Sequence, residues 1–242
     1  MASSIYILND LCDLEADRRH ERKRTRPLAS GRISIISGFF VGTMLALLAF
    51  AVGALLNGNF LSVLAVYAFV NIFYSFKGKS LLVLDVVLLA SMYTLRIIAG
   101  GAATGIPGST WLMGFSIFFF LGLALMKRAS EIAHLQEVDG RVKGRAYEGT
   151  DKTVVVAIGC ASSLLSLLVL VLYFESANVQ KLYSRHEYLW FTIPLLAYWI
   201  SRTWILANRS RMGEDPVLFA LKDAPSWIVL SVVGITFWVA AR

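Results

Sequence analysis

The sequence contains little cysteine, little histidine and little charge. Its two cysteines, Cys12 and Cys160, are too few for a disulfide framework or a zinc site. The three histidines are scattered over loops, and none belongs to an HExxH motif or to a pair at metal-ligand spacing, which argues against a zinc hydrolase. The chain also has no linker, no low-complexity segment and no soluble module. These absences predict one domain over residues 1–242.

Apolar sequence, in contrast, is abundant. Hydrophobic residues make up 57% of the chain and charged residues 16%. Several stretches approach or exceed the ~20 apolar residues that cross a bilayer, which predicts an all-α, polytopic membrane bundle with seven full spans. The expected spans are 35–56, 60–75, 81–100, 109–126, 153–174, 187–206 and 226–241. Residues 1–8 form an N-terminal stub that is too short to cross and lacks the basic start of a signal peptide.

The distribution of basic residues predicts the orientation. The segments 9–32, 76–80, 127–152 and 202–225 hold seven, two, six and four lysines or arginines, which is nineteen of the 23. The alternate loops and the C-terminus hold three, and Arg96 lies within a span. We therefore expect the four basic segments to face the cytoplasm. Membrane lipids and phosphorylated substrates account for the net charge of +7, so no nucleic-acid partner is expected.

The first basic segment begins with acidic residues. On a helix, Asn9, Asp13 and Asp17 fall at i, i+4 and i+8 on one face, and Asp10 lies about one turn before Asp13. Carboxylates on one stripe repel each other unless a cation lies among them. Mg²⁺ suits such oxygen ligands, because it is held by one or two carboxylates together with phosphate oxygens.

Basic residues follow these acids at once. Lys23, Arg24 and Arg26 supply the positive charge that a phosphorylated substrate needs. Together, the acids and bases predict a metal–phosphate site. The alternative is a solvated juxtamembrane helix with charges of both signs, but such helices rarely place every acid before every base.

A second charged group begins at Lys127. Lys127 and Glu131 are spaced i, i+4, and Arg128 and Glu131 i, i+3, so these residues can share a helix face. The alternative is a pair of bases that snorkel at a membrane boundary. Arg145 and Tyr147 follow in a loop with glycine, which favours phosphate binding here.

A third group surrounds Tyr74, Lys79 and Asp85. Asp85 lies about one turn inside a span, where an ionised carboxylate costs a few kcal/mol unless it is paired, so it marks a site or a contact across helices. Arg96 lies ~16 Å further along the same helix, too far to pair with Asp85. We expect Arg96 either to snorkel or to close a polar contact inside the bundle.

Residues 9–34, NDLCDLEADRRHERKRTRPLASGRIS, resemble the first aspartate-rich motif of the UbiA superfamily of membrane prenyltransferases. That motif is NDxxDxxxD followed by a basic residue, RP and SG. The remaining sequence resembles the branch that includes the decaprenyl-phosphate phosphoribosyltransferases. The branch features are YSFK with a later Lys and LD, LRIIAGG, KRxxE, GRxY and a terminal DPVxFAxxD.

The resemblance implies a UbiA-type bundle with an Mg²⁺ site. Asp10, Asp13 and Asp17 would hold the metal and serve in catalysis. Substrate-binding roles are implied for a larger set: Asn9, Lys23, Arg26, Tyr74, Lys79, Asp85, Lys127, Arg128, Glu131, Arg145 and Tyr147. The implied reaction transfers 5-phosphoribosyl from phosphoribosyl diphosphate to a polyprenyl phosphate.

The sequence departs from the family pattern in two ways. The first concerns the donor substrate, and the second concerns the number of membrane spans. The second DxxxD motif is absent, because Leu89 stands four residues after Asp85, and this disfavours a prenyl diphosphate as donor. Relative to the nine spans usual in the family, we expect the first span and most of the second to be missing. Two alternatives therefore stay open: a prenyltransferase with a prenyl diphosphate donor and an aromatic or polar acceptor, and a truncated, non-catalytic membrane remnant or subunit.

Sparse charge within the spans argues against an ion-coupled transporter. The expected location is the bacterial inner membrane, with the active site facing the cytoplasm. The expected partners are a polyprenyl lipid, a diphosphate donor and membrane lipids, and a homo-oligomeric state is left open.

Overall fold

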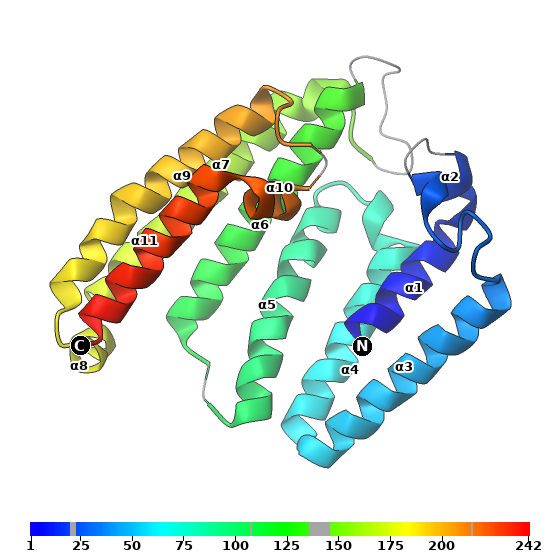
Figure 1. Ribbon diagram of the computed structural model, residues 1–242, viewed down its shortest axis with the longest axis horizontal. Coiled ribbons are helices and arrows are strands. Elements are labelled where there is room, and N and C mark those ends of the chain that lie inside the picture. Colours follow the sequence, from blue (N-terminus) through cyan, green and yellow to red (C-terminus); the bar gives the residue numbers. More distant parts are fainter. Residues whose placement is uncertain (20–22, 107, 136–145, 214) are drawn as a thin grey trace. The chain divides into compact units, whose positions relative to one another are not determined.

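A computed structural model describes residues 1–19, 23–106, 108–135, 146–213 and 215–242. Within these residues every extended regular element is a helix, which confirms the predicted all-α class (Figure 1). The chain divides into two compact units. Unit 1 comprises Met1–Leu88 and Leu95–Gly108, and unit 2 comprises Leu89–Thr94 and Ser109–Arg242. The expectation of a single domain stays a prediction.

In unit 1, the described residues form five α-helices and two short 3-10 turns. They are α1 Ala2–Cys12, α2 Leu14–Arg19, η1 Lys23–Thr25, α3 Ile35–Leu56, α4 Gly58–Phe76, η2 Gly78–Ser80 and α5 Leu84–Thr104, of which the segment Leu89–Thr94 belongs to unit 2. Side-chain caps set two of the helix starts. The Ser34 hydroxyl accepts from Ser37 N at 3.0 Å, and Asn57 Oδ1 accepts from Phe60 N at 2.8 Å.

Small residues let α1 pack closely against α3. Gly38 and Gly42 form a GxxxG pattern on α3, and both are buried. The Ser4 hydroxyl on α1 donates to the carbonyl oxygen of Gly42 at 2.7 Å. A Cβ at residue 42 would lie 3.3 Å from the Ile7 side chain, so glycine keeps this contact close. The contact fixes α1, and with it the acidic segment at its C-terminal end.

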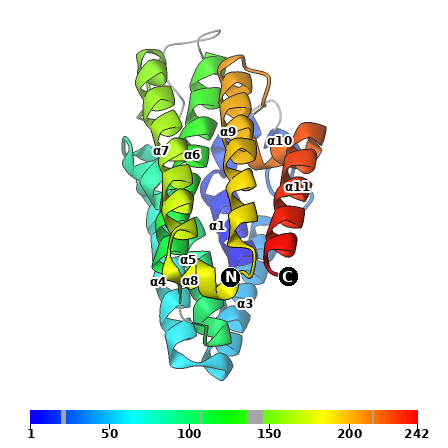
Figure 2. The ribbon, with the colours of Figure 1, turned by 90° about the vertical axis from the view of Figure 1, so that its left-hand side faces the viewer.

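Unit 2 contains the remaining elements. They are α6 Thr110–Leu135, η3 Gly149–Asp151, α7 Lys152–Phe174, α8 Ala177–Leu182, η4 His186–Phe191, α9 Thr192–Asn208, α10 Pro216–Lys222 and α11 Ala224–Ala240. Helices α6, α7 and α9 run side by side (Figure 2). Buried serines of α7 join them, since the Ser162 hydroxyl donates to Phe118 O on α6 at 2.9 Å and Trp204 Nε1 on α9 donates to Ser163 Oγ at 3.0 Å.

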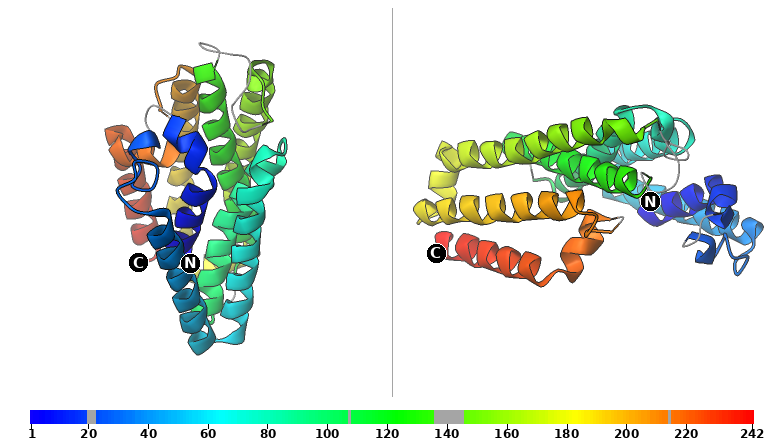
Figure 3. Two further views of the ribbon diagram at one scale, coloured as in Figure 1. Left: turned by 90° about the vertical axis from the view of Figure 1, so that its right-hand side faces the viewer. Right: turned by 90° about the horizontal axis from the view of Figure 1, so that it is seen from above.

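A sharp corner separates α10 from α11. The two helices meet at 83°, with Asp223 between them (Figure 3, right). Arg202 on α9 donates to both carboxylate oxygens of Asp223, at 2.8 and 2.9 Å. Asp223 Oδ2 also accepts from the N–H and the hydroxyl of Ser226, at 3.0 and 2.7 Å. The Asp223 carboxylate therefore caps the N-terminus of α11 and links the α10–α11 corner to α9 through Arg202.

The helices confirm an integral membrane protein. Among the described residues, five helical segments are long and apolar enough to cross a bilayer, or six if the bent α10–α11 pair is one span. Seven spans were expected. The difference includes 187–206, where a 3-10 turn precedes α9, whose 17 residues fall short of the ~20 that span a bilayer. The exact number of spans stays a prediction.

Candidate functional site

The acidic segment lies at the junction of α1 and α2. Asp13 interrupts the regular helix with φ −95° and ψ 8°. Helical hydrogen bonds nevertheless continue on both sides: Asp13 N donates to Asn9 O at 2.9 Å, and Asp17 N donates to Asp13 O at 2.8 Å. The expected turn spacing is therefore kept, although the helix is broken within the motif.

The polar side chains of the motif divide among three partners, Arg26, Ser75 and Lys79. Arg26 Nη1 donates to Asp10 Oδ1 at 2.9 Å and to Asp17 Oδ2 at 2.8 Å. Asp10 and Asp17 are seven residues apart, which is about two helical turns, so both can face one guanidinium. Asn9 and Asp13 turn elsewhere: Asn9 contacts Ser75, and Asp13 pairs with Lys79. The sequence predicted a single stripe of side chains. In the structure they form two groups instead, Asp10 with Asp17 and Asn9 with Asp13.

Negative charge within this cluster is incompletely balanced. Burial raises the pKa of the Asp10 carboxyl above its ordinary value, and the charges of Asp17 and Asp13 act in the same direction, while Arg26 opposes them. Arg26 is therefore not sufficient to offset burial and repulsion at Asp10. An additional cation near these carboxylates would lower their mutual repulsion.

The donor set fits a metal that is shared with a substrate. No three Asp, Glu, His or Cys side chains converge as a metal cluster in the part of the chain that the structure describes. Mg²⁺ requires only one or two carboxylates when a phosphorylated ligand supplies further oxygens. The oxygens of Asp10, Asp13, Asp17 and Asn9 are of that hard type, so their chemistry suits Mg²⁺ on a diphosphate.

The third predicted group, around Tyr74, Lys79 and Asp85, lies at the same end of unit 1 as the acidic segment. The Lys79 ammonium in η2 pairs with Asp13, and this ion pair joins residues that are 66 positions apart. Tyr74 is buried on α4, and Asp85 is fully buried in the first turn of α5. Lys23 lies in η1, half-buried, three residues before Arg26. Residues of the basic segments 9–32 and 76–80 therefore meet within unit 1.

A strained turn precedes Asp85. Val83 has φ 64° and ψ −38°, and Leu84 N donates to Leu82 O at 2.7 Å. This is a γ-turn of the rare, strained kind, which is unusual for a β-branched residue. It sets the start of α5 and hence the position of the buried carboxylate.

Arg96 closes a polar contact within unit 1, the second of its two expected outcomes. Its Nε and Nη2 donate to the hydroxyl oxygen of Tyr67, at 3.2 and 2.9 Å. The guanidinium carbon also lies 5.7 Å from the centre of the Tyr67 ring, within cation–π range. The side chain is thus held by a neighbouring helix.

In unit 2 the predicted charged group is divided in a similar way. The Arg128 side chain is 1% exposed and pairs with Glu131, one turn further along α6. A side chain buried to this degree does not snorkel to an interface, so the boundary alternative fails for Arg128. Lys127 instead lies 3.9 Å from Asp215, at the start of α10. Tyr147 is buried, and Arg145 lies outside the described residues.

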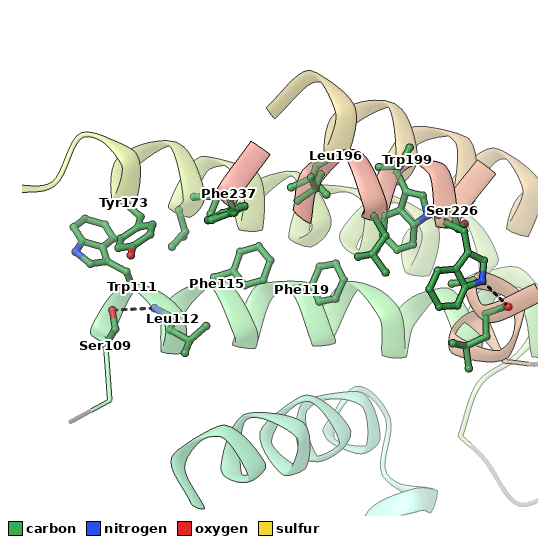
Figure 4. Close-up of a pocket in the computed structure, with 18 residues that line it drawn as sticks. Ser109, Trp111, Leu112, Phe115, Phe119, Tyr173, Leu196, Trp199, Ser226 and Phe237 are labelled. Carbon is green, nitrogen blue, oxygen red and sulfur yellow. Dashed lines mark hydrogen bonds between the residues drawn. The ribbon is translucent and has the colours of Figure 1, made fainter. Parts of the chain in front are cut away.

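Unit 2 also contains an apolar cavity that the sequence did not predict. Its volume is about 560 Å³, and aromatic side chains dominate its lining. Figure 4 shows Phe115 and Phe119 on α6 facing Phe237 on α11 and Trp199 on α9. At one wall Trp199 Nε1 donates to Ser226 Oγ at 2.8 Å, which connects the cavity to the polar corner at Asp223. A flexible apolar ligand of moderate size would fit a cavity of this volume.

Unit 1 has polar oxygens and bases at one end of its helices, and unit 2 has an apolar cavity. Each is a feature of a lipid-modifying transferase of the membrane. The chain belongs to the UbiA prenyltransferase family, which matches residues 1–240.

Three similar proteins illustrate the relationship. An uncharacterized protein y4nM of Sinorhizobium fredii is 34% identical over 99% of this chain and 47% of its own length. Nodulation protein NoeC of Azorhizobium caulinodans is 31% identical over 100% of this chain and 80% of its own length. A decaprenyl-phosphate phosphoribosyltransferase of Mycobacterium tuberculosis is 30% identical over 98% of this chain and 78% of its own length. The chain thus spans about half of the first protein and about four fifths of the other two.

Proposed function

We propose that the protein is an Mg²⁺-dependent membrane transferase that moves 5-phosphoribosyl from phosphoribosyl diphosphate to a polyprenyl phosphate. The observation that carries this proposal is the cluster at the α1–α2 junction, where three aspartates and an asparagine lie among Arg26 and Lys79. Acids for a metal and bases for phosphate oxygens are both needed to hold a diphosphate. The name of the mycobacterial relative supports the choice of donor and acceptor.

In this proposal the acids and bases have separate tasks. Asp10, Asp13 and Asp17 would hold Mg²⁺, which when bound neutralises the diphosphate and so stabilises pyrophosphate as a leaving group. Arg26 and Lys79 would hold phosphate oxygens, and each would exchange part of its contact with aspartate for contact with the donor. The acceptor phosphate is already anionic, so its attack on C1 of the ribose needs no general base.

The cavity of unit 2 is proposed to bind the apolar chain of a polyprenyl lipid. Its aromatic lining offers apolar surface without charged groups, which suits a polyprenyl chain. The bilayer around an integral membrane protein would supply such a lipid directly. The expected location is the inner membrane of a bacterium, with the acidic segment on the cytoplasmic side.

A pyrophosphate-release assay tests the reaction. Purified full-length protein in nanodiscs should release pyrophosphate from phosphoribosyl diphosphate only when Mg²⁺ and a polyprenyl phosphate are both present. Asp13→Asn should lower the rate by about 10²–10³-fold, the typical cost of one electrostatic group at a reacting centre. Glu15→Gln is the matched control, because Glu15 lies two residues away with its side chain 88% exposed and should tolerate the change.

The same assay separates the alternatives. Turnover of a prenyl diphosphate with an aromatic acceptor, and none of phosphoribosyl diphosphate, would replace the proposed donor. Equal rates for Asp13→Asn and Glu15→Gln would remove the acidic segment from the site.

A further inference from the structure

Ser75 is a buried hydroxyl in contact with the acidic segment, and the first motif of the sequence does not include it. It lies on α4, one residue before the end of the helix, and is 1% exposed. Its Oγ lies 2.7 Å from the carbonyl oxygen of Asn71 and also contacts Oδ1 of the Asn9 side-chain amide. Water cannot reach a group buried to this degree, so both contacts must be satisfied within the protein.

A count of hydrogens decides how the Asn9 amide is oriented. A serine hydroxyl carries one hydrogen, and the carbonyl oxygen of Asn71 can only accept. The structure places the Asn9 oxygen toward Ser75, so two close oxygen–oxygen contacts share a single hydrogen, and the amide must be turned end for end to remove this conflict. Both contacts contain a hydrogen only if Ser75 donates to Asn71 O and the Asn9 amide nitrogen donates to Ser75 Oγ. Since the oxygen and nitrogen of an amide are not distinguished by shape, this count is the physical basis for the assignment.

The next residue on this face of α4 makes the same kind of bond. Asn71 is 6% exposed, and its Nδ2 donates to Tyr67 O at 2.7 Å. Tyr67, Asn71 and Ser75 are spaced by four, so the hydrogen bonds run along one buried face of the helix. Each donor points toward the N-terminus of α4. This series of hydrogen-bonded residues ends at Asn9, which lies on α1, whereas Tyr67, Asn71 and Ser75 all lie on α4.

We propose that Ser75 is a positioning residue that holds the Asn9 amide with its oxygen directed away from α4. In this orientation the nitrogen is committed to Ser75, and the oxygen is presented as a neutral ligand beside the aspartates. The inference rests on the proposed function, because an oriented oxygen matters only if a metal and a diphosphate bind there. Partners of this kind commonly fix the geometry of metal ligands without touching the metal.

Binding of Mn²⁺ together with inorganic pyrophosphate tests the role of Ser75 without turnover. Electron paramagnetic resonance on the full chain in nanodiscs would give Mn²⁺ affinity with and without pyrophosphate. Ser75→Ala should weaken the pyrophosphate-dependent affinity by about 10-fold or more, as is usual when a partner of a ligand is removed. Ser62→Ala is the matched control, because the Ser62 hydroxyl makes the same bond to Gly58 O, at 2.9 Å on the same helix, but is exposed.

Folding and metal binding are separated by a second variant. Ser75→Cys keeps a side chain of similar size and a weak donor, so it should fold where Ser75→Ala does not and should still bind Mn²⁺ more weakly than the natural protein. Thermal unfolding of each variant gives the folded fraction for the comparison. Natural affinity in a folded Ser75 variant would overturn the positioning role and leave the proposed function intact. Failure of the natural protein to bind Mn²⁺ with pyrophosphate would overturn both.

Discussion

The carboxylate at the α10–α11 corner should contribute more to stability than any other helix cap of unit 2 that the structure describes. Asp223 and Asp215 provide a comparison, because each begins a short or bent helical segment and each faces a basic side chain. Asp223 has a two-pronged pair with Arg202, and these side chains are 11% and 24% exposed. Asp215 lies 3.9 Å from Lys127, and both of those side chains are more than one-third exposed.

The expected magnitudes follow from this difference. Asp223→Ala removes both bonds to Arg202 and the cap on Ser226 N, leaving a largely buried guanidinium without its carboxylate, so it should cost about 3–5 kcal/mol. Asp215→Ala removes a cap on Val217 N, worth about 1 kcal/mol, and an exposed pair worth about 0–1 kcal/mol. Asp223→Asn keeps an oxygen for the cap but loses the charge, so its loss of stability should lie between those of Asp223→Ala and Asp215→Ala.

Thermal unfolding in detergent measures the difference. For a chain of this size, each kcal/mol shifts Tm by about 2–4 °C, so Asp223→Ala should unfold at least about 2 °C below Asp215→Ala. Addition of saturating lipid to all variants should preserve their order. Equal Tm values for Asp223→Ala and Asp215→Ala would refute the reasoning, because the two-pronged buried pair would then contribute nothing beyond an ordinary cap.

Two backbone predictions concern glycine. Gly122→Ala should lower stability by about 1–3 kcal/mol, because its Cβ would lie 2.2 Å from Ser163 Oγ at the α6–α7 contact. Gly114→Ala is the control and should be neutral or slightly stabilising, because its Cβ would lie 3.6 Å from the nearest atom. Equal Tm values for the two variants would contradict this prediction. Val83→Gly should raise stability by about 1 kcal/mol, since relief of strain at a positive φ exceeds the entropy cost of glycine and the Val83 side chain is 49% exposed. A lower Tm for Val83→Gly would mean that the γ-turn is not strained.

The apolar spans could be predicted closely from the sequence because bilayer length and hydropathy constrain them strongly. The expected 35–56 agrees with α3 at both ends, where Ser34 and Asn57 supply caps. The expected span 109–126 coincides with the first part of α6, which continues to Leu135 through Lys127 and Glu131, so these two residues share a helix as their i, i+4 spacing predicts. Charge ends a membrane span but does not end a helix, and the continuing turns bring Arg128 onto Glu131. The corner at Asp223 has no signal in hydropathy, because both arms are apolar.

The members of the candidate site could be named from the sequence, but their pairing could not. Periodicity placed Asn9, Asp13 and Asp17 on one face, yet the partner of each side chain lies elsewhere in the chain. Arg26 approaches Asp10 and Asp17 from η1, and Lys79 approaches Asp13 from a turn after α4. Ser75 belongs to the YSFK feature of the sequence, but no role in the site could be assigned to it, because a serine in an apolar helix usually bonds only to its own backbone. Its distinguishing contact, to Asn9, is visible only once α1 and α4 are packed.

The 66-residue separation between these partners has a consequence for synthesis of the protein. A nascent chain that has inserted α1 to α3 already carries every aspartate of the motif, but Ser75 and Lys79 have yet to be made. Contacts between residues so distant in sequence form late, after the intervening segments are ordered. Arg26 is therefore available to Asp10 and Asp17 from the start, whereas the partners of Asn9 and Asp13 become available only once the end of α4 and the turn after it have been made.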